Sequence, residues 1–209
     1  MAKLNAVQLL HSDLVSHNVD IALISETWFE VRHADDSVSM EGFSLLRRDR
    51  FKRGCGGVCI YFRSCLDVTE CIFPSALQPN LEIIWIKCFF KNQIYYIACC
   101  YHPPKPIYPL NVVIQALSDD VDKILSFNDN SVIIVAGHVN KLNIDFLELN
   151  YGLVQLVHQP THGVNTLNKF FCSRPDIFSA TVFKSLIKTK HQAVMVTEES
   201  NDIPLTRLK

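Results

Sequence analysis

Apolar residues recur three or four positions apart in two parts of this chain, the spacing that places them on one face of a helix. This periodicity predicts an amphipathic helix near residues 3–17 and a longer helix over residues 110–125. We interpret the apolar face of the longer helix as a packing surface, not as a partner-binding face. The positions that carry the pattern are Leu4, Val7, Leu10, Leu14, Leu110, Val113, Ile114, Leu117, Val121, Ile124 and Leu125.

Between and after these helices, short apolar or alternating runs predict strands. Residues 20–25 form an almost fully apolar run, as expected for a strand buried on both faces. The runs 81–89 and 94–101 are separated by a short polar segment and predict a hairpin. Strands interspersed with helices predict an α/β fold of two sheets with helices outside. The predicted strands lie at residues 20–25, 43–48, 58–63, 81–89, 94–101, 132–136, 153–157, 167–172, 177–183 and 192–196.

Composition places the chain among globular proteins. It has 209 residues, of which 48% are apolar and 20% charged, enough for one domain with a sizeable core. No internal repeat, low-complexity segment or domain boundary is visible, so residues 1–209 are expected to form a single domain. The longest apolar runs are of strand length, and the first residues lack the pattern of a secretory signal. We therefore expect no membrane association and an intracellular location, in the cytoplasm or nucleus.

Eight cysteines raise the question of disulfide bonds, but none belongs to a Cys-x-x-Cys pair. Cys59, Cys88, Cys99 and Cys100 fall inside predicted strands. Thiols in such positions are typical of buried, reduced cysteines in an intracellular protein, and we predict that state here.

The net charge of −1 and an isoelectric point near 6.7 do not by themselves indicate a nucleic-acid-binding protein. The local exception is the segment 47–53, in which five of seven residues are basic. Such a segment beside a glycine-rich turn can hold backbone phosphates. The alternative, which we favour at this point, is a solvated loop between strands.

Polar residues of possible chemical importance lie where predicted strands begin or end. Glu26 follows the strand 20–25, a position from which a carboxylate can hold a divalent cation. The turn 137–140 follows the strand 132–136, with His138 and Asn140 at its polar positions, and His191 directly precedes the last predicted strand. These residues form a site only if the fold brings them together.

Other aromatic residues have simpler interpretations. Trp28 and Trp85 are expected to be core aromatics and not stacking platforms for bases. His102, His158 and His162 are expected to be loop residues, because no spacing of histidines and cysteines indicates a zinc site.

Seven segments, in this order along the chain, are similar to the motifs of one known family. They are residues 25–29 (SETWF), 54–61 (GCGGVCIY), 101–104 (YHPP), 135–140 (VAGHVN), 155–162 (QLVHQPTH), 165–171 (NTLNKFF) and 188–191 (KTKH). Through them the chain resembles the endonuclease/exonuclease/phosphatase superfamily, and within it the endonuclease domains of non-LTR (LINE-type) retrotransposons. The similarity extends over nearly the whole chain.

This resemblance implies a four-layer α/β/β/α sandwich and the Mg²⁺-dependent cleavage of a DNA phosphodiester bond. It also implies DNA as the partner, and we expect the chain to be a monomer. The family's first strand has no counterpart, because the sequence begins inside the helix that follows it. The resemblance therefore predicts an N-terminally truncated domain.

Four residues match the family's functional positions. Glu26 corresponds to a carboxylate that helps to hold the metal, and Asn140 to an asparagine that contacts the phosphate. His191 corresponds to the histidine that stabilises the phosphoryl charge, and Tyr101 to an aromatic residue that contacts the DNA backbone. These roles are implied by the resemblance.

Three acids of the family are replaced. His138 stands in place of the aspartate that activates water, Asn168 in place of the aspartate that orients the histidine, and Lys190 in place of a metal-binding aspartate. Loss of a general base alone lowers a rate by about 10²–10⁴-fold, and a lysine replaces an anion by a cation beside the expected Mg²⁺. Asp176 is not counted as a replacement, because the family carries a similar acid downstream of that motif. We therefore expect impaired or absent catalysis; an active endonuclease that tolerates the substitutions is the alternative.

Overall fold

The computed structural model of this protein describes residues 5–30, 32–50, 56–140, 142–187 and 189–199. Parts of several predicted features lie outside these residues: residues 3–4 of the first helix, residues 51–53 of the basic segment, residues 54–55 of the glycine-rich turn, and Lys188 of the last motif.

The described elements follow the predicted order closely. The helices are α1 (Ala6–Ser16), α2 (Leu110–Phe127) and α3 (Phe146–Tyr151), with 3₁₀ turns η1 (Asp35–Ser37), η2 (Pro74–Leu77) and η3 (Pro175–Ile177). The strands are β1 (Ile21–Ser25), β2 (Phe43–Arg48), β3 (Val58–Arg63), β4 (Val68–Cys71), β5 (Glu82–Phe90), β6 (Gln93–Tyr101), β7 (Val132–His138), β8 (Val154–Gln155), β9 (Asn168–Cys172), β10 (Phe178–Phe183) and β11 (Ala193–Glu198). Every predicted helix and strand is confirmed, with shifted ends, whereas β4 and α3 were not predicted.

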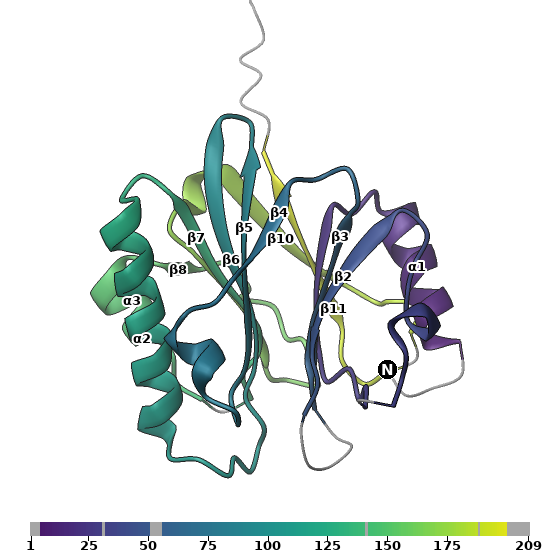
Figure 1. Ribbon diagram of the computed structural model, residues 1–209, viewed down its shortest axis with the longest axis horizontal. Coiled ribbons are helices and arrows are strands. Elements are labelled where there is room, and N and C mark those ends of the chain that lie inside the picture. Colours follow the sequence, from purple (N-terminus) through teal and green to yellow (C-terminus); the bar gives the residue numbers. More distant parts are fainter. Residues whose placement is uncertain (1–4, 31, 51–55, 141, 188, 200–209) are drawn as a thin grey trace, which may run out of the picture.

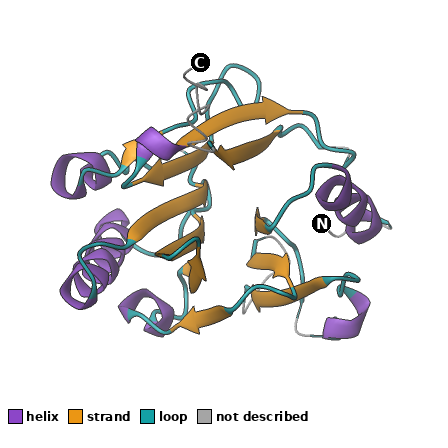
Figure 2. Cartoon of the chain, turned by 90° about the horizontal axis from the view of Figure 1, so that it is seen from above, coloured by secondary structure: helices purple, strands orange, loops and turns teal. Residues whose placement is uncertain are grey.

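The strands form one large sheet and two smaller ones. The large sheet has the order β4-β5-β6-β7-β9-β8, and the smaller sheets are β1-β3-β2 and β10-β11. Among the described strands, β6 and β7 form the parallel pair and the other pairs are antiparallel. Helices α2 and α3 cover the outer face of the large sheet, and α1 covers the three-stranded sheet (Figures 1 and 2). The result is the α/β/β/α layering expected from the sequence.

Three apolar clusters fill the spaces between these layers. The first lies between the large sheet and α2 and α3, and includes Trp85, Leu117 and Leu147. The second lies between the two sheets, with Ile60 and Ile86 at its centre, and the third lies between the three-stranded sheet and α1. Because alternate residues of a strand face opposite sides, the central strands are apolar on both faces.

The described cysteines agree with the prediction of buried, free thiols. Cys59, Cys88, Cys99 and Cys100 are all buried and none is disulfide-bonded. Burial raises the pKa of Cys88 to about 11 and that of Cys100 to about 12, since a thiolate is poorly solvated there. None of the helices in the described residues is long and apolar enough to cross a membrane.

Asp120 of α2 is a buried acid that ties this helix to the large sheet. Its Oδ2 accepts a hydrogen bond from Trp85 Nε1 at 2.7 Å, and its Oδ1 accepts one from the backbone N–H of Ser75 at 3.0 Å. All three residues are at most 1% exposed. Burial raises the pKa of Asp120. The hydrogen bonds from Ser75 and Trp85 stabilise the carboxylate and so oppose this rise.

Asp120→Ala should therefore lower the free energy of unfolding by about 3 kcal/mol, because it leaves two buried donors without an acceptor. Urea denaturation followed by tryptophan fluorescence measures the change. The matched control is Asp119→Ala, which removes an exposed neighbour bonded to Gln115 and should change stability by less than about 0.5 kcal/mol. Equal effects of the two substitutions would contradict a structural role for Asp120.

Candidate active site

The ends of three neighbouring strands place three predicted site residues in one row. In the register of the large sheet, Tyr101 of β6 pairs with His138 of β7, and His138 pairs with Asn168 of β9. Gly137 lets β7 lie this close to β6: a Cβ at Gly137 would meet the carbonyl oxygen of Cys100 at 1.9 Å, and its φ is +144°. The row therefore depends on a position that only glycine fits.

Glu26 reaches this row from the opposite sheet. It follows the last residue of β1, and its Oε1 accepts a hydrogen bond from the Tyr101 hydroxyl at 2.6 Å. Burial raises the pKa of Tyr101, and the bond to Glu26 raises it further. Arg50 lies 5.5 Å from the Tyr101 ring centroid and is itself paired with Glu82. Tyr101 is thus a neutral donor that orients the Glu26 carboxylate.

His138 and Asn168 form a polar chain that fixes the form of the imidazole. The Asn168 Nδ2 donates to the carbonyl oxygen of Gln192 at 3.0 Å, so its Oδ1 is the atom that faces His138 Nδ1, also at 3.0 Å. Because Oδ1 only accepts, the His138 Nδ1 carries the proton. The lone pair of a neutral His138 is therefore on Nε2.

Two further histidines pack beside His138. The His191 ring lies 4.8 Å from the His138 ring, and His162 stacks on His191 with 4.5 Å between ring centroids. Burial lowers the pKa of His191, and repulsion from the two neighbouring imidazoles lowers it further. The His191 Nδ1 is buried without a hydrogen-bond partner among the described residues. Burial and the neighbouring imidazoles therefore both favour the neutral form of His191.

A buried threonine holds the loops that carry these histidines together. The Thr161 hydroxyl accepts hydrogen bonds from the backbone N–H groups of Leu167 and Asn168, at 2.9 and 3.0 Å. The Thr161 carbonyl accepts one from the N–H of Gln192 at 2.8 Å. Thr161 thereby ties three segments that are distant in the sequence to one another.

A cleft of about 1540 Å³ lies between β1, β11 and the inner face of the large sheet. Glu26, His138, Asn168, Lys190 and His191 all line it, so the structure brings these predicted residues together. Lys190 is exposed at this cleft.

Asn140 is placed differently. Its Nδ2 donates to the carbonyl oxygen of His102 at 2.7 Å, from a backbone with φ of +49°. It is not among the residues that line the cleft. Asp176 also stays apart, since it pairs with Arg174 at the surface, in agreement with its not being counted as a replacement acid.

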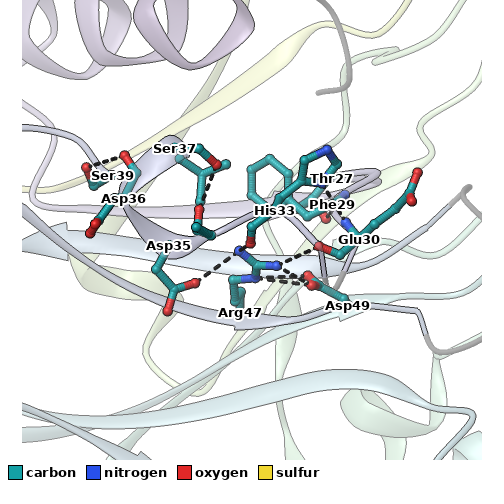
Figure 3. A network of polar contacts seen from close by, with 12 residues as sticks. Thr27, Phe29, Glu30, His33, Asp35, Asp36, Ser37, Ser39, Arg47 and Asp49 are labelled. Atoms are coloured by element: carbon teal, nitrogen blue, oxygen red, sulfur yellow. Dashed lines mark hydrogen bonds and ion pairs between the residues drawn. The ribbon is translucent and has the colours of Figure 1, made fainter.

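The solvated-loop interpretation of the basic segment is wrong for Arg47 and Arg48, which end strand β2 and make internal contacts. Phosphate binding by the segment stays a prediction. The side chain of Arg47 is 14% exposed and is held by Asp49 and Asp35 and by the carbonyl groups of Glu30 and His33 (Figure 3). Arg48 donates to the carbonyl oxygens of three residues from 76 to 83, and Arg50 pairs with Glu82. These guanidinium groups join segments of the fold, because the strand buries them beside acceptors.

The two tryptophans also differ from each other. Trp85 is 1% exposed and bonded to Asp120, which confirms the prediction of a core residue. Trp28 is 42% exposed and lines the cleft, so the prediction of a core position is wrong. Its backbone has φ of +58°, in the left-handed region.

His102, His158 and His162 lie in loops as predicted, but sequence reasoning missed the part of His162 in the cluster. The sequence did contain a signal for this role, because His162 is the last residue of the segment 155–162, which is similar to a family motif. His102, by contrast, is buried and contacts Tyr108, with 3.2 Å between Nδ1 and the hydroxyl.

Solved structures with the same arrangement identify the fold. The chain is similar to truncated TDP2 from Caenorhabditis elegans (TM-score 0.68, 12% identity, 94% of this chain and 92% of the other covered). It is similar to the 3′-5′ exonuclease NExo from Neisseria meningitidis (TM-score 0.65, 14% identity, 93% and 96% covered) and to an AP endonuclease from Archaeoglobus fulgidus (0.61, 11%, 92% and 93%).

No family model and no curated protein sequence matches the chain. At these identities the structural likeness shows the fold alone. The chain has the α/β sandwich fold of the endonuclease/exonuclease/phosphatase type, as the sequence predicted.

Proposed function

We propose that this chain is a DNA-binding domain of the endonuclease/exonuclease/phosphatase superfamily, descended from a retrotransposon Mg²⁺-dependent endonuclease, in which hydrolysis is impaired or absent. The support for the ancestry is the seven motifs in register along the sequence. The support for DNA binding is that proteins of this fold have been crystallised with DNA: NExo with a product DNA hairpin and Danio rerio TDP2 with a single-strand DNA product.

One observation carries the loss of hydrolysis. At the strand ends where the family's motifs have aspartates, the cleft contains His138, Asn168 and Lys190. The residues present do not fit Mg²⁺, which takes six oxygen ligands in a regular octahedron. Glu26 is the remaining motif carboxylate, and its Oε1 accepts a hydrogen bond from the Tyr101 hydroxyl.

The arrangement of the remaining side chains also argues against a Mg²⁺ site. In the part of the chain that the structure describes, no group of three histidine, cysteine, aspartate or glutamate side chains is arranged to hold a metal ion. His138 Nδ1 is engaged with Asn168, and the His191 and His162 rings are stacked on each other. We therefore derive no hydrolytic step through Mg²⁺ for this chain.

The second candidate function is an active metal-dependent endonuclease. In its favour, Glu26 and His191 still line the same cleft as His138. A neutral His138 with its lone pair on Nε2 is also a chemically competent general base. This alternative requires that some cation be held without the three acids.

A nicking and binding experiment separates these functions. Purified protein and Glu26→Ala are incubated with supercoiled plasmid and Mg²⁺ or Mn²⁺, and binding of labelled oligonucleotides is followed by fluorescence anisotropy over a series of salt concentrations. We expect salt-dependent binding, with no more nicking by the unmodified chain than by Glu26→Ala. Robust metal-dependent nicking that Glu26→Ala abolishes would overturn the loss of hydrolysis. Absence of any binding at low salt would overturn DNA binding.

A further inference from the structure

Trp28 is a large apolar side chain that the fold keeps in solvent at the rim of the candidate site. It is 42% exposed, and it lines the same cleft as Glu26, His138 and His191. Trp85, the other tryptophan of the chain, is fully buried. An exposed indole that lines a cleft offers a contact surface for a flat apolar ligand.

The backbone at Glu26 and Trp28 has a conformation that residues other than glycine disfavour. Glu26 and Trp28 have φ of +56° and +58°, in the left-handed region that residues other than glycine rarely adopt. Two backbone hydrogen bonds fix them: Thr27 N–H donates to the Gly57 carbonyl at 3.2 Å, and Trp28 N–H donates to the Gly56 carbonyl at 2.8 Å. Thr27 is completely buried between them, so the turn cannot relax without disturbing β3.

The residues that follow Trp28 are clamped as well. Phe29 is buried, and the Arg47 guanidinium lies 5.4 Å from its ring centroid. Arg47 also donates to the carbonyl oxygens of Glu30 at 3.0 Å and His33 at 2.9 Å (Figure 3). Trp28 is therefore presented by a segment that is anchored on both sides, and little conformational entropy is lost when a ligand covers the ring.

The charges that line the same cleft as the indole indicate which ligand fits. Lys169, Lys184 and Lys190 line the cleft, and none of them makes an ion pair with a described residue. A groove that carries both cationic side chains and an exposed aromatic ring can hold a single-stranded nucleic acid, with phosphates on the cations and a base on the ring. A paired base has both faces covered by its neighbours in the duplex, so only an unpaired base offers a free face.

We propose that Trp28 stacks on an unpaired base of a bound DNA strand and gives the domain a preference for single-stranded over duplex DNA. This inference rests on the proposed DNA binding and adds to it the form of the DNA and the residue that selects it. Arg47, Gly56 and Gly57 act as positioning residues, since they hold Trp28 in place without touching the base.

Tryptophan fluorescence tests this directly, because Trp85 is buried and bonded to Asp120, whereas Trp28 faces the solvent. Addition of a short thymidine oligonucleotide should quench the emission of the unmodified protein, and the matched blunt duplex should quench it less. Trp28→Ala should weaken single-strand binding by about 5- to 100-fold, measured by anisotropy. Trp28→Phe should retain most of the binding, because it keeps a stacking ring, but should lose the quenching.

Phe127→Ala is the matched control. Phe127 is a 67% exposed aromatic at the end of α2, outside the cleft, so its removal should leave binding unchanged. Circular dichroism and thermal unfolding establish that each variant is folded. If Trp28→Ala binds the oligonucleotide as tightly as the unmodified protein, or if duplex quenches as strongly as single strand, the inference about Trp28 is wrong while DNA binding stands. If the unmodified protein binds neither DNA, the proposed function fails together with it.

Discussion

A His138→Asp, Asn168→Asp, Lys190→Asp triple variant should nick supercoiled DNA in the presence of Mg²⁺ at least about 10²-fold faster than the unmodified chain. The three positions lie at one cleft together with Glu26, so the new carboxylates would supply the oxygen donors that the cleft lacks. Because His138 and Asn168 are direct partners across β7 and β9, acids introduced at both positions repel each other unless a cation lies between them.

That repulsion gives the experiment a readout besides activity. Mg²⁺ should raise the melting temperature of the triple variant and leave that of the unmodified protein unchanged, because a ligand stabilises only the state that binds it. Adding Glu26→Ala to the triple variant should remove both the nicking and the Mg²⁺ effect. Equal nicking by the unmodified chain and the triple variant would contradict the role assigned to the three substitutions. If the unmodified chain and the triple variant are both inactive, the three substitutions are not the sole cause of the lost activity.

Gly137→Ala should destabilise the protein by more than about 4 kcal/mol, enough to prevent recovery of folded material. The new Cβ would lie 1.9 Å from the carbonyl oxygen of Cys100 and 2.9 Å from its backbone nitrogen. Both atoms belong to β6, a central strand of the large sheet, so neither can move away without breaking the β6–β7 pairing. The φ of +144° adds backbone strain to this clash.

Gly152→Ala is the control that separates the clash from the backbone strain. Gly152 also has positive φ, +65°, but a Cβ there meets nothing within 4 Å. Its replacement should cost only about 1–2 kcal/mol, the usual penalty of a left-handed residue. The two variants are compared by soluble yield and by urea denaturation. A Gly137→Ala protein as stable as Gly152→Ala would mean that β6 and β7 are not packed as described.

The elements that the sequence missed have short or weakly patterned sequences. β4 (Val68–Cys71) has only four residues, of which the two central ones are polar, so it shows no alternation; it is formed by pairing with β5. α3 (Phe146–Tyr151) has six residues, too few to show a helical period, and ends at Gly152 in the left-handed conformation. Both exist because neighbouring segments stabilise them.

The predictions that failed concern side chains whose partners are far away in the sequence. Arg47 and Arg48 look like surface cations in a basic segment, yet they end a strand whose neighbours offer carbonyl groups and acids. Trp28 looks like a core residue, because tryptophan usually is one, but it is 42% exposed and its backbone N–H bonds to the carbonyl oxygen of the distant Gly56. His162 lies in a loop as predicted, but its stacking on the ring of His191, which is distant in the sequence, was not predicted.

The sequence by itself determined the order of helices and strands, the α/β sandwich and the identity of the residues at the candidate site. The order of elements and the sandwich depend on periodicity, which is local and can be read along the chain. The site residues were identified through the resemblance of seven segments to the motifs of one family. Only the tertiary structure decided which of those residues share a cleft, that the arginines bond internally, and that Trp28 faces solvent. These outcomes depend on contacts between segments distant in the sequence, whose geometry no local pattern encodes.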